Sequence, residues 1–147
     1  MDALVIAEIP LDQADVIQTL NRLVFGESRL VQHVEHPGLL ILTATWKGTL
    51  VGFKIGYPKD RQTFYSAKGA VDPAFRRRGV ARKLLHFMMS RVYLSGFDTF
   101  QYHTFPNRDP GMLIIGLQEG FRVTDARHND EFNDWQVELS KPLTGGD

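Results

Sequence analysis

The spacing of apolar residues along the chain changes several times, and each change predicts a new element. Residues 3–8 form a short run rich in β-branched side chains, which predicts a first strand. Over residues 11–26 the apolar positions recur at helical spacing, as they do on one face of a helix. Residues 28–36 repeat this spacing more briefly and end before Pro37, so a second short helix is expected there.

The middle of the chain predicts consecutive strands. The runs at 39–46 and 49–57 flank a short turn at 47–48, which is typical of an antiparallel hairpin. A further strand is expected at 63–71, and it should end before Pro73 because proline cannot continue a β-ladder.

The second half of the chain begins with the most pronounced helical pattern. Apolar residues between Val80 and Val92 form a wide stripe, and Gly96 is expected to close the helix. Shorter elements then follow in chain order: a strand at 99–104, a helix at 111–118, a strand that starts at 121–123, and a strand at 134–139.

This order of elements predicts the α/β class, with a mixed, mostly antiparallel sheet flanked by helices. Strands joined by hairpins should be antiparallel, whereas the strands at 63–71 and 99–104 are joined through a helix and should be parallel. No linker or repeat interrupts the pattern. We therefore expect one domain over residues 1–141 and a flexible C-terminal tail over 142–147.

The composition excludes several classes of protein. The chain has 147 residues, 43% of them hydrophobic, as suits one globular domain. It has no cysteine, which excludes disulfides, thiolate metal sites and a cysteine nucleophile. Its 17 basic and 17 acidic residues cancel, so no overall field would attract nucleic acid. Because no apolar run reaches the ~18 residues of a membrane span and no signal peptide is evident, we expect a cytoplasmic protein with no membrane partner.

One segment carries recognisable chemistry. Between Val71 and Ala81 a strand ends, the chain turns at Pro73, passes a run of arginines and enters a helix at Gly79. The first N–H groups of a helix have no intrahelical acceptors and the helix dipole makes that end positive, so the segment predicts an anion-binding site. Neither a P-loop nor a Gly-x-Gly-x-x-Gly fingerprint is present. A plain solvated run of arginines at 76–78 is the alternative interpretation.

The unit formed by a strand, Val71-x-Pro73 and Arg76-x-x-Gly79-x-Ala81 resembles the central acyl-CoA-binding motif of the GCN5-related N-acetyltransferases (the GNAT superfamily). The resemblance implies acetyl-CoA, or another acyl-CoA, as co-substrate, and no metal. It implies that the parallel strands splay apart in the centre of the sheet and that the pantetheine arm pairs with the first of them. A main-chain N–H near Ala70 and Val71 would then polarise the thioester carbonyl. The residues that the resemblance places at the cofactor are Ala70, Val71, Asp72, Pro73, Arg76, Arg77, Arg78, Gly79, Val80, Ala81, Arg82 and Asn107.

The resemblance does not assign the catalytic groups. Many members carry a tyrosine acid in the helix that corresponds to 111–118, but this chain has Gly116 at that position. The strand at 63–71 has no carboxylate, so the general base is unassigned. Glu27, Glu35 and Ser66 are candidates by location, with a solvated helix charge or simple packing as the alternative for each.

Four other side chains are candidates for contacts with ligands. Tyr65 is a candidate for the acceptor pocket and His103 for a contact with acceptor or cofactor, with packing as the alternative for both. His33 and His36 lack a third ligand at a metal-like spacing, so no zinc site is expected.

These observations predict an acyl-CoA-dependent N-acetyltransferase in which a primary amine attacks acetyl-CoA directly. The acceptor would be a small molecule or a peptide, and a homodimer is left open. The missing tyrosine keeps a second hypothesis open, a non-catalytic acyl-CoA-binding regulatory module. A nucleic-acid-binding domain that uses residues 76–78 and Lys83 is disfavoured by the net charge of +0.

Overall fold

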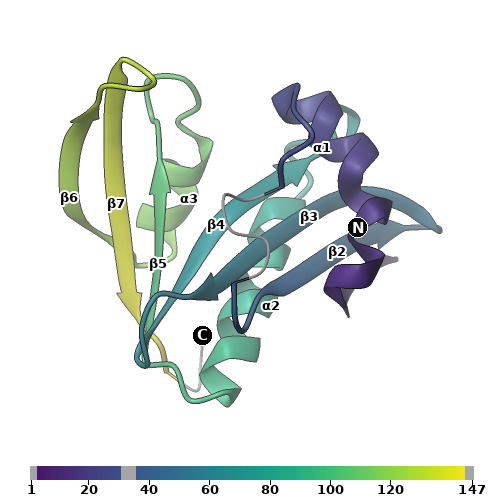
Figure 1. The fold of residues 1–147 in the computed structure, drawn as a ribbon, viewed down its shortest axis with the longest axis horizontal. Coiled ribbons are helices and arrows are strands. Elements are labelled where there is room, and N and C mark those ends of the chain that lie inside the picture. Colours follow the sequence, from purple (N-terminus) through teal and green to yellow (C-terminus); the bar gives the residue numbers. More distant parts are fainter. Residues whose placement is uncertain (1–2, 31–35, 145–147) are drawn as a thin grey trace.

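One mixed sheet organises the computed structural model, which describes residues 3–30 and 36–144. In these residues the sheet has 7 strands in the spatial order β1-β2-β3-β4-β5-β7-β6 (Figure 1). All neighbouring strands are antiparallel except β4 and β5, which are parallel, so the predicted fold class is confirmed. The strands are β1 (Leu4–Ile9), β2 (Leu40–Trp46), β3 (Thr49–Pro58), β4 (Thr63–Val71), β5 (Thr99–Thr104), β6 (Arg122–Asn129) and β7 (Asp134–Pro142).

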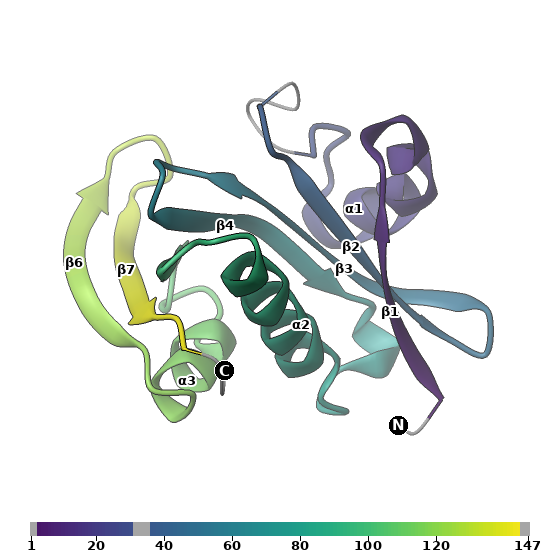
Figure 2. The same cartoon turned by 90° about the horizontal axis from the view of Figure 1, so that it is seen from below.

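Helices cover both faces of this sheet (Figure 2). One face packs against α2 (Val80–Leu94), whose buried residues share a core cluster with Leu42, Phe64 and Phe100. The short helix α3 (Gly111–Gln118) packs against the same cluster. The other face packs against α1 (Gln18–Phe25) and the turn before it, which share a second cluster with Phe53 and Ile55.

The predicted helix over 11–26 is only partly α-helical. Its first part, Leu11–Ile17, is a 3-10 helix, and α1 begins at Gln18. Ala14, Ile17 and Leu20 are the buried apolar residues here, and this interval of three matches the three-residue turn of a 3-10 helix.

The second predicted helix, over 28–36, is not found at the positions of this range that the structure describes. Residues 28–30 and 36 are not helical, and residues 31–35 lie outside the described part of the chain. The main-chain oxygens of Glu27 and Arg29 accept hydrogen bonds from the Asn21 side chain, and Lys68 also donates to the Arg29 oxygen at 2.8 Å. These bonds use the carbonyls that a helix would need for its own ladder.

The C-terminal strand is longer than predicted. β7 runs to Pro142, beyond the expected end at 139, and the N–H of Leu143 donates to the Asp98 oxygen at 2.8 Å. Leu143 is buried in the core next to α2. Pro142 and Leu143 thus belong to the folded domain rather than to the expected tail, because Leu143 packs in the core cluster and bonds to Asp98, which is distant in sequence.

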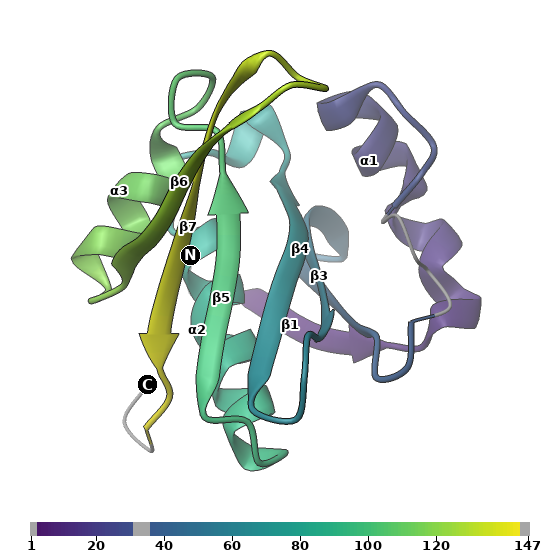
Figure 3. The same ribbon diagram turned by 60° about the vertical axis from the view of Figure 1, so that its left-hand side comes forward.

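The parallel strands separate as predicted. β4 and β5 pair only from Thr63 and Thr99 to Ser66 and Tyr102, although both strands continue (Figure 3). The register between β3 and β4 shifts at the same point and leaves Ala67 as an extra residue. Such a bulge bends the strand that carries it, which accounts for β4 turning away from β5.

Candidate active site

The part of β4 beyond the bulge has one edge without a strand partner. The N–H of Asp72 donates to the Val51 oxygen on β3 at 2.8 Å. Because main-chain groups alternate between the two sides of a strand, Ala70 and Asp72 direct their N–H groups toward β3, whereas Gly69 and Val71 direct theirs toward the side that β5 has left. Val71 is thus the predicted cofactor residue on this strand that offers main-chain groups to an added ligand strand.

The turn after β4 exposes the N-terminus of α2. The Asp72 carboxylate accepts from the Ala74 N–H at 2.9 Å and caps a short 3-10 turn at Pro73–Phe75. Within α2 the first amide with a helical acceptor is that of Lys83, which donates to the Gly79 oxygen at 3.0 Å. In the described part of the chain, no protein acceptor meets the amides of residues 79–82. Their N–H groups and the helix dipole together form a site that suits a phosphate.

Backbone conformation rather than crowding requires glycine at position 79. Gly79 has a φ of 82°, in the left-handed region that L side chains rarely adopt, and nothing lies within 4 Å of the place a Cβ would take. Arg77 also has a positive φ, of 63°. These two left-handed residues turn the chain sharply into α2 and leave its first amides exposed.

The predicted arginines divide into two groups. Arg76, Arg77 and Arg78 are exposed beside the start of α2, and Arg78 lies over the Phe75 ring. Arg82 instead pairs with Glu119 at the end of α3 and donates to Gln118 at 2.7 Å. The Arg82 guanidinium thus connects α2 to α3. The group of Arg82 that can bind an anion is therefore its backbone amide.

Asn107 is also engaged within the protein. Its side-chain amide donates to the Asp134 carboxylate at 3.1 Å, and Arg108 pairs with the same carboxylate at 3.1 Å. The loop after β5 is thereby fixed to the start of β7. Asn107 stays a predicted cofactor contact that would have to leave this bond or act through another atom.

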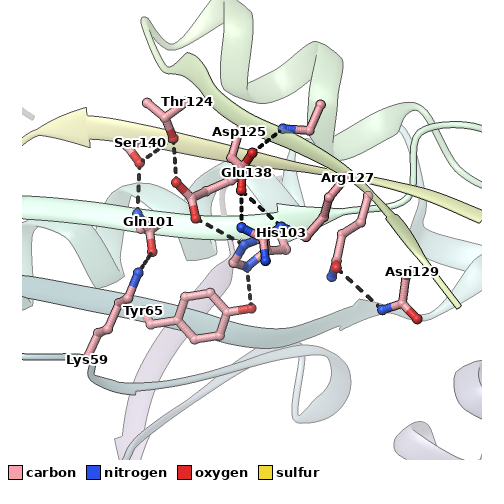
Figure 4. Close-up of polar contacts among 12 residues, drawn as sticks. Lys59, Tyr65, Gln101, His103, Thr124, Asp125, Arg127, Asn129, Glu138 and Ser140 are labelled. Carbon is pink, nitrogen blue, oxygen red and sulfur yellow. Dashed lines mark hydrogen bonds and ion pairs between the residues drawn. The ribbon is translucent and has the colours of Figure 1, made fainter. Parts of the chain in front are cut away.

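The opposite face of the sheet carries a chain of polar groups across β4, β5 and β7 (Figure 4). The Tyr65 hydroxyl lies 2.8 Å from His103 Nδ1, and His103 Nε2 lies 3.2 Å from the Glu138 carboxylate. His103 follows Tyr102 and Glu138 precedes Leu139 in sequence, and these two neighbours pack in the core beside α2. The alternation of side chains along a strand therefore places His103 and Glu138 on the other face.

The protonation states of this chain follow from its surroundings. The imidazole nitrogen next to Glu138 donates to that carboxylate, which leaves Nδ1 to accept from the Tyr65 hydroxyl. Burial lowers the pKa of His103, although Glu138 opposes this by favouring the imidazolium. Burial raises the pKa of Tyr65 to about 12. The raised pKa keeps Tyr65 protonated and the lowered pKa favours a neutral His103 at neutral pH, so their hydrogen bond provides a path for a proton from Tyr65 to His103.

Further hydrogen bonds hold Glu138 in place. Thr124 donates to Glu138 at 2.7 Å and lies 3.0 Å from the Ser140 hydroxyl. Gln101 donates to Ser140 at 3.1 Å, and Lys59 donates to Gln101 at 2.7 Å (Figure 4). The carboxylate thus has a fixed orientation, as expected of a group that orients an imidazole.

The candidates that the sequence suggested for the base are less suited. The Glu27 carboxylate pairs with Lys68 at 2.9 Å, and this hydrogen bond lowers its pKa, which makes it a weaker base. Ser66 is buried at the last pair of the parallel strands. Glu35 lies outside the described residues. The sequence pointed to Tyr65 and His103 only weakly and missed Glu138, because pairing between β5 and β7 cannot be seen in the order of residues.

A physical reason explains glycine at position 116. A Cβ added there would lie 2.1 Å from the Tyr102 hydroxyl, which enters from β5 and donates to the Met112 oxygen at 2.7 Å. Any side chain at 116, a tyrosine included, would collide with Tyr102. The residues described at 3–30 and 36–144 hold no cluster of His, Asp and Glu that could bind a metal, and their helices are too short or too polar to cross a membrane.

The fold and the site together define the architecture of an acyl-CoA acyltransferase. Its features are the parallel strands β4 and β5, which separate, and the neighbouring helix α2, whose first amides have no protein acceptor among the described residues. The model of the acetyltransferase (GNAT) family matches residues 10–112, so the chain belongs to that family. No match is found among the curated proteins.

Solved structures share the fold along almost the whole chain. Ard1 from Thermoplasma volcanium has a TM-score of 0.80 at 20% identity, over 97% of this chain and 99% of that one. An aminoglycoside 6'-N-acetyltransferase complexed with coenzyme A has a TM-score of 0.78 at 15% identity, over 95% and 97%. A GNAT family acetyltransferase from Elizabethkingia anophelis with acetyl-CoA bound has a TM-score of 0.74 at 20% identity, over 97% and 100%.

Proposed function

We propose that this protein transfers an acetyl group from acetyl-CoA to a primary amine. The observation that carries the proposal is the juxtaposition of the open β4 edge at Val71 with the bare amides of residues 79–82. An extended, amide-containing ligand with a diphosphate at one end has complementary groups for both features. Two of the structures with this fold contain coenzyme A or acetyl-CoA, which supports the same ligand here.

The chemical groups at the site are complementary to those of acetyl-CoA. Amides 79–82 supply donors for a diphosphate, and Arg76, Arg77 and Arg78 add positive charge beside them. The Val71 main chain supplies one donor and one acceptor for an amide of the ligand. Acetyl-CoA, when bound, supplies an acetyl group activated as a thioester.

The acceptor amine must lose a proton when it attacks, and we propose that Tyr65 and His103 receive it. We assign the Tyr65 hydroxyl as the group that takes the amine proton while it passes its own to His103. Glu138 then stabilises the imidazolium through its 3.2 Å contact with Nε2. The chain lies at the point where β4 and β5 separate, because Tyr65 precedes the last paired residue of β4.

The acceptor belongs to the class of primary amines, of a small molecule or of a peptide. A relative in fold is named for acetylation of aminoglycosides, which places small polyamines first in a screen. The test is calorimetry with acetyl-CoA, followed by release of free thiol with a panel of amines and N-terminal peptides. We expect binding by wild type, turnover with at least one amine, and loss of turnover but not of binding in H103Q.

The alternative is a non-catalytic acyl-CoA-binding module. Gly116 favours it, since the position of the family's tyrosine acid is filled by Tyr102. Binding of acetyl-CoA without turnover across the whole panel would favour this alternative. Absence of binding at millimolar acetyl-CoA would contradict both.

A further inference from the structure

Lys54 is a buried lysine in the middle of the sheet. It lies on β3, pairs with Gly69 of β4, and is 6% exposed. Its side chain shares a face with Gly52, where an added Cβ would meet Val80 and Leu84 of α2. Lys54 is therefore on the α2 side of the sheet, opposite Tyr65 and His103.

The ammonium lies beside the place where β4 and β5 part. Its Nζ is 3.7 Å from the place a Gly69 Cβ would take and 6.0 Å from the centre of the Tyr102 ring on β5. Both neighbours lie at or beyond the last pair of these strands, Ser66 with Tyr102. Since Gly69 has no side chain, the Lys54 Nζ lies close to the β4 backbone at that residue.

In the part of the chain that the structure describes, no carboxylate pairs with Lys54. Among the residues described, the interaction found for its Nζ is the distant contact with the Tyr102 ring at 6.0 Å, and no hydrogen bond or ion pair to it is found. Leu42 and Gly69 pair with it on the neighbouring strands, and α2 contributes Val80 and Leu84 over this part of the sheet. Tyr102 is the titratable group beside it, and its hydroxyl is bonded to Met112. Burial alone lowers the pKa of Lys54 to about 8.

We propose that Lys54 is the acid that protonates the thiol leaving group of the transfer, in place of the tyrosine that Gly116 excludes. The inference rests on the proposed function. A thioester ligand that follows the open edge from Val71 to Gly69 reaches Lys54, and an unpaired buried cation is costly unless it serves a ligand.

The proton balance is simple. The amine nitrogen bonds to the carbonyl carbon, the carbon–sulfur bond breaks, and its electron pair stays on sulfur. Lys54 gives that sulfur a proton, becomes a neutral amine and is recharged by water. A pKa of about 8 is close to that of a thiol, roughly 8–9, so the proton transfer is nearly balanced in energy.

The first test needs no acceptor amine. Titration of the thiolate absorbance of bound coenzyme A should show a thiol pKa at least about one unit below that of free coenzyme A, which is about a tenfold larger thiolate fraction at a given pH. K54M should abolish this shift, and K83M, which changes an exposed lysine of α2, should retain it. An equal shift in wild type and K54M would overturn the proposal.

A second measurement uses wild type alone, so it holds even if K54M does not fold. The Lys54 ammonium is titrated by NMR with coenzyme A and with desulfo-coenzyme A bound. We expect a higher Lys54 pKa with the thiol ligand, and equal values would overturn the contact. With an active amine, K54M should lower kcat by about 10²-fold with little change in the KM for acetyl-CoA, and the loss of rate above about pH 8 should disappear. A thiol shift without any turnover would contradict the proposed function but keep the Lys54 contact.

Discussion

Replacement of Lys54 by methionine should stabilise the protein, by an amount that depends on pH. The pKa of Lys54 falls from 10.5 to about 8 because the side chain is buried without a partner. At about 1.4 kcal/mol per pKa unit, this drop corresponds to about 3 kcal/mol of cost to the folded state wherever the lysine is charged in both states. Methionine has a similar length and no charge, so it removes the cost with little change in packing.

The sign follows from proton binding. Below about pH 8 the folded and unfolded chains both carry the charge, and the folded state bears the whole penalty. Between about pH 8 and 10.5 the folded chain has lost the proton while the unfolded chain keeps it, so the free energy of unfolding rises with pH. The advantage of K54M should thus be about 3 kcal/mol near neutral pH and should vanish toward pH 10.5.

Urea denaturation at several pH values measures this directly. The difference between variant and wild type cancels the contributions of Tyr57 and Tyr65, whose raised pKa values affect both proteins alike. K83M provides the control, since Lys83 is exposed on the same fold. A K54M protein that is less stable than wild type near pH 7, or a difference that does not change with pH, would refute the burial of an unpaired ammonium.

Three further predictions concern the site. G79V should weaken acetyl-CoA binding about tenfold or more, because a β-branched residue resists the left-handed φ that presents the amides. R77A should weaken the same binding less than about fivefold. Calorimetry compares the two variants, and a larger loss of affinity in R77A would contradict a site made of main-chain groups. E138Q should lower the pKa of His103 and move the acid limb of the rate profile to lower pH, and a shift to higher pH would argue against the contact. G116A should lower the melting temperature through its clash with Tyr102, and Y102F should relieve part of that loss in the double variant; independent effects would exclude the clash.

The local parts of the site could be predicted from the sequence. The strand, the turn at Pro73, Gly79 and the helix of α2 are contiguous, so their spacing alone indicates where unpaired amides occur. The order of elements also implies the parallel pair of β4 and β5. These features follow from relations between residues that are close in sequence, so a single sequence is enough to predict them.

The parts that the sequence did not reveal depend on distant pairing. His103 meets Glu138 through the register of β5 with β7, and Lys54 becomes buried because α2 packs over that face of β3. In the sequence, Lys54 is an ordinary polar position within a strand. Arg82 likewise looks like a free cation until α3 brings Glu119 to it.

The central claim is that the start of α2 and the open edge of β4 together bind coenzyme A. Titration of the amide NMR signals with coenzyme A tests it most directly. We expect the largest shifts at Val71 and at residues 79–82, with loss of these shifts in G79V. The account would be contradicted if coenzyme A bound without shifting these amide signals, or if the shifted signals came only from another face of the sheet.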